Sequence, residues 1–111
     1  MDYTKDKVIE MARSFLRQAS KRHPIQAAYI FGSYAMETQK PYSDIDIAVI
    51  LGRAAEYGKY HEETFEIFHE AQEYNSLMEV ICFKEDEFEN DGMTIISRIK
   101  KEGIKIEFSR E

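Results

Sequence analysis

Cysteine is nearly absent from the sequence, and this narrows the kinds of protein that it can encode. The only cysteine among the 111 residues is Cys82, so no disulfide can form within the chain. No apolar run is long enough to cross a bilayer, and the first residues lack the basic-then-apolar pattern of a secretion signal. We therefore expect a cytoplasmic protein with no membrane partner.

Basic residues are also scarce relative to acidic ones. The chain has 15 Lys and Arg against 21 Asp and Glu, a formal net charge of −6, which argues against a general affinity for DNA or RNA. Only 5 glycines and 2 prolines are present, and no repeat, linker or low-complexity segment interrupts the chain. A length of 111 residues suits one hydrophobic core, so we expect a single domain over residues 1–111.

Apolar periodicity predicts alternating helices and strands. Amphipathic helix spacing extends over residues 4–21 and stops before Pro24. Short apolar runs predict strands at 25–31, 44–51 and 77–83, and strict alternation predicts an edge strand at 104–108. Further helices are expected over residues 34–38, 57–74 and 92–102. This order predicts an α/β or α+β fold, in which helices pack on a small mixed sheet of about four strands.

The helix at 57–74 has two contrasting sides. One side should face the core and carries Tyr60, Thr64, Phe65, Phe68 and Ala71. The other should face solvent and carries Glu62, Glu63, Glu66 and Glu70. The three histidines, His23, His61 and His69, lack the spacing of a zinc site. We interpret His61 and His69, which lie on this helix, as exposed to solvent. Cys82 lies in an apolar run and should be buried.

Two aspartates interrupt an otherwise apolar strand. Asp44 and Asp46 are separated by one residue, so on a strand they point to the same side, roughly 6 to 7 Å apart at their roots. Ile45 and Ile47 point the other way. Two carboxylates this close repel each other, and an uncompensated charge near a core costs on the order of several kcal/mol. A positive charge should therefore lie between them.

Glu79 would join these aspartates if the strand at 77–83 lies beside the strand at 44–51. No Lys or Arg lies within the first three predicted strands to neutralise the acids. Mg²⁺ would do so, and three carboxylates could hold two ions about 3.5 to 4 Å apart, the arrangement used for phosphoryl or nucleotidyl transfer. Two alternatives to a metal site are open. Asp44 and Asp46 could be exposed acids at the start of an edge strand, and Glu79 could form an ion pair with a lysine elsewhere.

Gly32 and Ser33 follow directly after the first predicted strand. Glycine allows a close approach of the backbone to a phosphate, and the amides at the start of a helix favour an anion. Ser33 could also cap the short helix that follows. Arg53 and Lys59, beyond the strand that carries the aspartates, are further candidates for phosphate contacts.

The segment "GSYAMETQKPYSDID" contains Gly-Ser, ten residues and Asp-x-Asp. With Glu79 downstream, it closely resembles the minimal nucleotidyltransferase domains of the DNA polymerase beta superfamily, of the type found in HEPN/MNT toxin-antitoxin pairs. The closing "IKKEGIKIEF" is similar to the family's last helix, Gly and strand. The resemblance implies a nucleotidyltransferase fold, metal ligands at Asp44, Asp46 and Glu79, and a nucleotide phosphate turn at Gly32 and Ser33. It also implies Mg²⁺, ATP as substrate, and a HEPN-domain partner that receives AMP on a hydroxyl.

Two departures from the family pattern keep an alternative open. The third acid is more often Asp, and the helix after Gly-Ser is usually basic, whereas here it lacks the expected arginine and contains Glu37. A second hypothesis is therefore a non-catalytic antitoxin or regulatory module that neutralises its partner by direct contact. A small-molecule nucleotidyltransferase of the antibiotic-resistance type is less favoured, because those proteins have an additional substrate-binding domain. The nucleotide preference, the acceptor and homo-oligomer formation are left open.

Overall fold

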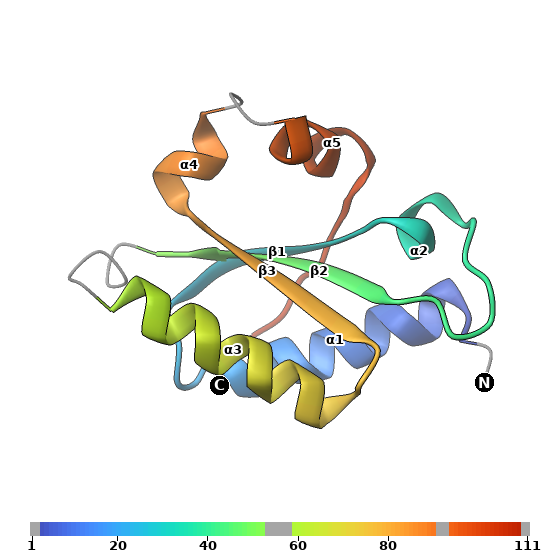
Figure 1. Ribbon diagram of the computed structural model, residues 1–111, viewed down its shortest axis with the longest axis horizontal. Coiled ribbons are helices and arrows are strands. Elements are labelled where there is room, and N and C mark those ends of the chain that lie inside the picture. The colour runs from blue at the N-terminus through green and yellow to red at the C-terminus, as the bar shows by residue number, and fades with distance from the viewer. Residues whose placement is uncertain (1–2, 53–58, 91–93, 110–111) are drawn as a thin grey trace.

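A four-stranded sheet forms the centre of the computed structural model, which describes residues 3–52, 59–90 and 94–109 (Figure 1). The strands are β1 (Ile25–Phe31), β2 (Ile45–Leu51), β3 (Met78–Lys84) and β4 (Ile104–Lys105), in the spatial order β3-β2-β1-β4. β1 runs antiparallel to β2 and β4, and β2 runs parallel to β3. The sheet is therefore mixed, and the α+β architecture predicted from the sequence is confirmed.

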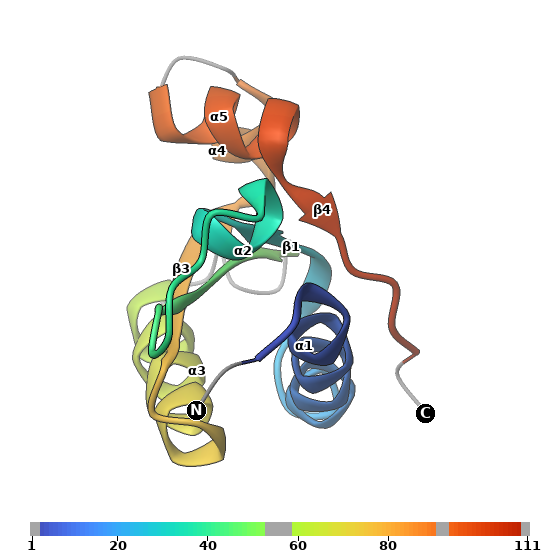
Figure 2. The ribbon, with the colours of Figure 1, turned by 90° about the vertical axis from the view of Figure 1, so that its right-hand side faces the viewer.

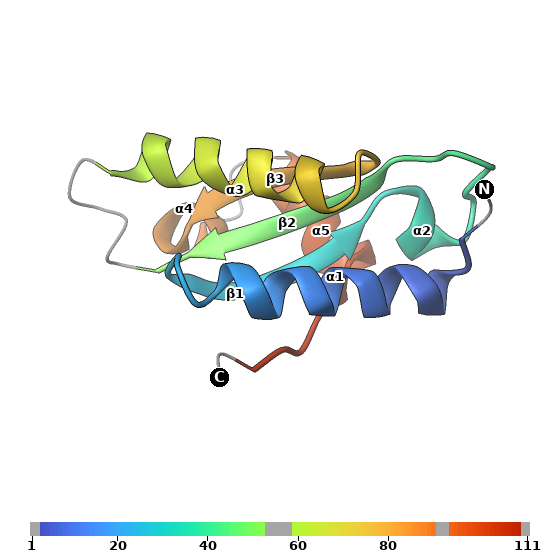
Figure 3. The same ribbon diagram turned by 90° about the horizontal axis from the view of Figure 1, so that it is seen from below.

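Helices cover both faces of this sheet (Figures 1 and 2). On one face, α1 (Lys5–Ala19) and α3 (Tyr60–Tyr74) lie side by side, as the view from below also shows (Figure 3). On the other face lie α4 (Glu85–Glu89) and α5 (Thr94–Glu102). The short α2 (Ser33–Met36) lies at the end of the sheet where β2 begins. Among the described residues, no helix is both long and apolar enough to cross a membrane.

Each face has its own apolar cluster. Val8, Phe15 and Leu16 of α1 pack with Ile67 of α3 against the sheet, and all four are at most 2% exposed. The opposite cluster joins the sheet to α4 and α5, and its buried members are Ala48, Ile50, Phe83, Phe88, Ile96 and Ile99. Because side chains alternate along a strand, Ile45, Ile47, Val49 and Leu51 of β2 contribute to the first cluster, and Ala48 and Ile50 contribute to the second.

The first helix and the first strand follow the sequence prediction closely. Thr4 caps α1, accepting a hydrogen bond from the Lys7 amide at 3.1 Å. β1 spans the predicted residues 25–31. β4 is shorter than the predicted 104–108, but its alternation holds, since Ile106 is buried and its amide donates to the Ala28 carbonyl at 2.9 Å.

The orientation of α3 differs from the prediction, and residues 57–58 of the predicted helix lie outside the described part. Ile67 and Ala71 are its fully buried residues, whereas Phe65 is 64% exposed and Phe68 is 39% exposed. The predicted inner stripe is therefore confirmed at Ala71 but wrong at Phe65 and Phe68, and the inner side instead includes Glu63, which contacts the buried His23. The inner face is therefore partly acidic.

One helix was missed altogether. The segment of α4, "EDEFE", contains one apolar residue, Phe88, which is 8% exposed and packs against the rings of Tyr29 and Phe83 at centroid distances of 5.4 and 6.0 Å. The Lys84 amide donates to Glu87 Oε1 at 3.0 Å, which closes the first turn. A single buried ring and one cap thus stabilise a turn of helix that periodicity cannot reveal.

Candidate metal and nucleotide site

Asp46 and Glu79 lie next to each other at one end of the sheet. The parallel register of β2 and β3 pairs Asp46 directly with Glu79, so their Cα atoms are separated by about one strand spacing, ~4.8 Å. Asp44 is exposed and immediately precedes β2, which begins one residue later than the predicted strand 44–51. The condition stated for Glu79, adjacency of its strand to that of the aspartates, is therefore met.

The electrostatics of Asp46 reflect this crowding. The pKa of the Asp46 carboxyl is raised from 3.8 to about 6, first by burial and then by the charges of Glu79 and Asp44. Within the described residues, no Lys, Arg or His forms an ion pair with any of the three acids. In the described part of the chain, Asp46 is thus a half-buried carboxylate that lies among like charges and has no ion-pair partner.

The donor set at this position fits a hard divalent cation. Carboxylate oxygens are the protein ligands that Mg²⁺ prefers, and Mg²⁺ is usually held by one or two of them together with phosphate oxygens and water. A bound dication would also remove the repulsion that raises the pKa of Asp46. The observed carboxylates therefore match the metal that the sequence suggests.

Gly32 is required by its conformation and by its neighbour. Its φ of 75° and ψ of −150° belong to a region that is essentially restricted to glycine. Because the register of β1 and β2 pairs Phe31 with Asp46, a Cβ on Gly32 would overlap Oδ2 of Asp46. The glycine thus allows the Gly32-Ser33 turn to lie directly against the acidic end of β2.

Ser33 does not cap α2. It is the first residue of α2, the cap residue is Gly32, and no side-chain capping bond forms, so the predicted Ser33 cap was wrong. In the described part of the chain, the Ser33 hydroxyl has no protein hydrogen-bond partner. Glu37 lies at the opposite end of α2 from Gly32, exposed and 3.9 Å from Nζ of Lys5. Its charge therefore lies at the far end of α2 and is partly balanced by Lys5.

A cleft of about 390 Å³ adjoins Gly32. It lies between the end of β1 and α5, and its lining comprises Phe31, Gly32, Ile95, Arg98, Ile99 and Glu102. Its volume is within the usual range for small-molecule sites. Arg98 is exposed, with its Nε 3.7 Å from Glu102 Oε1. Arg98 was not predicted, because only the packing of α5 against β1 brings it beside Gly32.

The other candidates lie elsewhere. Lys59 lies at the start of α3. The chain reaches α3 from the end of β2 that is opposite to Asp46, so Lys59 is remote from the acids. Arg53 lies outside the described residues. His61 and His69 are exposed, as expected. Cys82 is buried, and burial raises the pKa of its thiol to about 12, which makes it a core residue.

Comparisons with known proteins extend this description. A family described as "Polymerase beta, Nucleotidyltransferase" matches residues 15–110. No curated protein matches.

Three solved structures have a similar fold. A toxin-antitoxin structure with AMP-PNP has a TM-score of 0.58 and 21% identity, and the match covers 92% of this chain and 74% of that one. A mutant of the toxin-antitoxin MntA-HpeT has a TM-score of 0.53 and 19% identity, over 97% and 76% of the two chains. A proposed nucleotidyltransferase from Sulfolobus solfataricus has a TM-score of 0.52 and 20% identity, over 77% and 74%. These likenesses concern the fold.

Proposed function

Because this chain belongs to the polymerase beta nucleotidyltransferase family, we propose that it is an Mg²⁺-dependent enzyme that transfers AMP from ATP to a hydroxyl of a partner protein. The observation that carries the proposal is the pair Asp46 and Glu79, two adjacent carboxylates with no ion-pair partner among the described residues. Asp46 also lies against the Gly32 turn. A partner protein is the proposed acceptor because two similar folds come from toxin-antitoxin structures. A HEPN-domain protein, as the sequence resemblance implies, and a cytoplasmic location belong to the same proposal.

The chain's residues divide into two groups in this proposal. Asp44, Asp46 and Glu79 hold the metal, and Mg²⁺ when bound supplies positive charge to the phosphate oxygens. Gly32 and Ser33 bind the triphosphate through backbone amides and the free hydroxyl. The partner's hydroxyl oxygen attacks the α-phosphorus in line, a new O–P bond forms, the bond to the β-phosphate breaks, and pyrophosphate leaves with its electron pair. The hydroxyl proton passes to a nearby carboxylate or to water.

The cleft beside Gly32 gives the nucleotide a place to bind. Its apolar wall, formed by Phe31, Ile95 and Ile99, suits the flat face of a base, and Arg98 stands at its edge. No basic residue occurs in α2, whose sequence is "SYAM". We propose that Arg98 supplies from α5 the cation that α2 lacks.

A transfer assay tests the proposal. The protein is incubated with the product of its neighbouring gene, Mg²⁺ and ATP labelled at the α-phosphate. We expect label on the partner, loss of label with Asp46→Asn, and unchanged labelling with Asp86→Asn, an exposed acid beyond the opposite end of β3. A partner that stays unlabelled with the wild-type protein would rule out protein adenylylation.

The second hypothesis is a non-catalytic module that neutralises its partner by contact. The absence of a basic residue from α2 favours it. In this case the neutralisation of the partner would survive Asp44→Asn, and no label would be transferred. The two hypotheses are thus separated by whether label is transferred and whether neutralisation survives substitution of an aspartate.

A further inference from the structure

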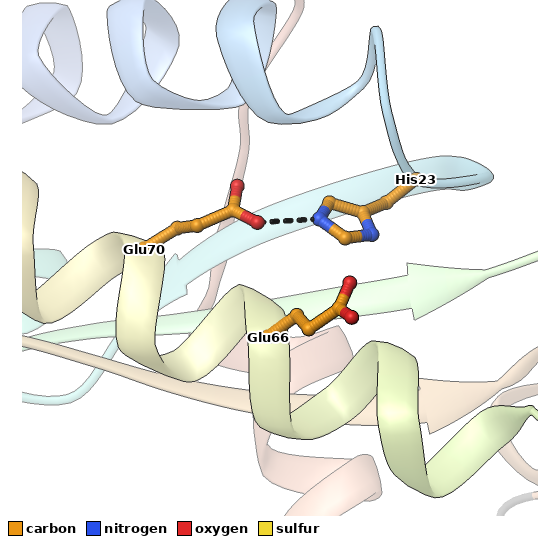
Figure 4. Close-up of side chains that lie close together, drawn as sticks. All are labelled: His23, Glu66 and Glu70. Atoms are coloured by element: carbon orange, nitrogen blue, oxygen red, sulfur yellow. Dashed lines mark hydrogen bonds and ion pairs between the residues drawn. The ribbon is translucent and has the colours of Figure 1, made fainter.

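His23 occupies a second polar cluster, which lies at the opposite end of β1 from Asp46. It lies in the turn between α1 and β1 and is 5% exposed. Its Nδ1 contacts Glu63, and its Nε2 lies 2.7 Å from Oε2 of Glu70 (Figure 4). β1 spans seven residues, which places the two ends about 20 Å apart. This cluster is therefore separate from the proposed nucleotide site.

The imidazole of His23 has a carboxylate at each ring nitrogen, and this arrangement favours a positive charge on the ring or bound to it. A neutral histidine has one N–H donor, so only one of its nitrogens can donate to a carboxylate. The other nitrogen of His23 then presents a lone pair to a second carboxylate. Burial lowers the pKa of His23, but the hydrogen bonds to Glu70 and Glu63 outweigh it and the pKa is raised. A proton or a metal ion on the second nitrogen would satisfy the arrangement.

A third carboxylate makes the cluster suitable for a metal. Glu66 lies one helical turn before Glu70 on α3, and one ligand atom each from His23, Glu66 and Glu70 lie within 4.8 Å of one another. Arg22 pairs with the outer oxygen of Glu70 at 2.7 Å, which leaves Oε2 directed at the imidazole. Figure 4 shows both glutamates reaching from α3 toward the ring.

We propose that His23, Glu66 and Glu70 form a binding site for a divalent transition-metal ion of the Zn²⁺ class. Nε2 of His23 and one oxygen of each glutamate are the ligands, and water completes the coordination. Glu63 accepts a hydrogen bond from the Nδ1–H of His23. At metal sites such a contact with a carboxylate fixes the tautomer of the histidine and leaves its other nitrogen free to bind the ion. An imidazole nitrogen favours Zn²⁺ over Mg²⁺, which takes oxygen ligands.

The required movement is small. Two ligands at about 2.1 Å from a tetrahedral ion are ~3.4 Å apart, and Nε2 and Oε2 of Glu70 are now separated by 2.7 Å. An increase of about 0.7 Å in the distance between Nε2 of His23 and Oε2 of Glu70 would make room for the ion. Glu66 is exposed and can close on the ion by side-chain rotation. The ion would tie the turn before β1 to α3, so it would stabilise the packing of α3 rather than take part in catalysis.

Metal titration of tag-free, chelator-treated protein tests this site. We expect one equivalent of Co²⁺ to give visible d–d absorption, which Zn²⁺ abolishes by competition, in the wild type and equally in Asp46→Asn. Glu66→Gln should weaken binding at least tenfold, and Glu63→Gln about 10- to 100-fold. Glu62→Gln, a matched change on the same helix, should have no effect. Since Glu66 is exposed, its substitution tests the ligand without disturbing the fold.

The histidine ring provides a second measurement. On addition of Zn²⁺, the NMR signals of His23 should shift and show a single ring N–H, while those of His61 and His69 stay unchanged. The proposal is overturned if no Co²⁺ absorption develops or if Glu66→Gln binds as tightly as the wild type. It is also overturned if His23 keeps both ring protons with Zn²⁺ present, because the histidine is then an imidazolium clamped between two carboxylates. Since the readouts do not involve nucleotide transfer, failure here leaves the proposed function untouched.

Discussion

Replacing Asp46 by asparagine should stabilise the metal-free protein while it removes the proposed activity. The pKa of this carboxyl is raised from 3.8 to about 6, by burial and by Glu79 and Asp44. The folded protein therefore binds this proton more tightly than the unfolded chain does. The wild type loses stability as the pH rises from about 4 to about 6, and the loss is complete above that range. Asparagine carries no charge at any of these pH values.

The magnitude follows from the same shift. The difference between 3.8 and about 6, at about 1.4 kcal/mol for each pH unit, gives an upper limit of ~3 kcal/mol. Because the side chain is half-buried, solvent screening reduces this to about 1 to 2 kcal/mol. At pH 4 the gain for Asp46→Asn should be about 0.5 kcal/mol or less, since the carboxyl of the folded wild type is then almost fully protonated and that of the unfolded chain is ionised only in part.

The assay is urea unfolding in EDTA at pH 4 and pH 8, with Asp86→Asn as the control for a lost exposed charge. Added Mg²⁺ should stabilise the wild type at pH 8 and leave Asp46→Asn unchanged, because a ligand that binds only the folded state raises its stability. If Asp46→Asn is no more stable than the wild type at pH 8 in EDTA, the carboxylate cluster is not a source of repulsion. The reasoning that assigns it a cation would then fail.

Four further outcomes are expected. Gly32→Ala should lower the free energy of unfolding by about 1 to 3 kcal/mol in urea titrations, because of its positive φ and the overlap with Asp46. Arg98→Ala should weaken ATP binding about tenfold by calorimetry and change the melting temperature little, since its exposed pair with Glu102 contributes at most ~0.5 kcal/mol. Phe88→Ala should cost about 3 kcal/mol or more, measured by the same unfolding. The thiol of Cys82 should react with Ellman's reagent at pH 8 only after unfolding. Equal reactivity of the folded and unfolded protein would contradict its burial.

Strands and the carboxylate site were accessible from the sequence because short-range patterns encode them. A continuous apolar run marks β1, and the spacing of Asp44 and Asp46 predicts a shared side for both; Asp46 lies in β2 and Asp44 directly before it. The pairing with Glu79 was conditional, since no local pattern determines which strands are neighbours. The parallel register of β2 and β3 fulfilled that condition.

Features that depend on tertiary contacts were missed. The inner face of α3 includes Glu63 and Glu70, because a histidine some 40 residues earlier in the chain accepts them as partners. A hydrophobicity pattern scores these glutamates as solvent-facing. In the same way, Arg98 lies beside Gly32 only because α5 packs against β1. Long-range ionic contacts of this kind have no signature in residue spacing.

The position of β4 has a consequence for synthesis of the chain. β1 is an inner strand of the finished sheet, but the neighbour that covers its outer edge arrives last: Tyr29 pairs with Lys105. At about 5 to 20 residues per second, a ribosome needs ~4 to 15 s to add the intervening residues. During that interval the edge of β1 has unpaired amides and carbonyls and can pair with another nascent chain. The short contact from Ile104 to Ile106 ends this exposure, so loss of those residues should appear first as aggregation during expression.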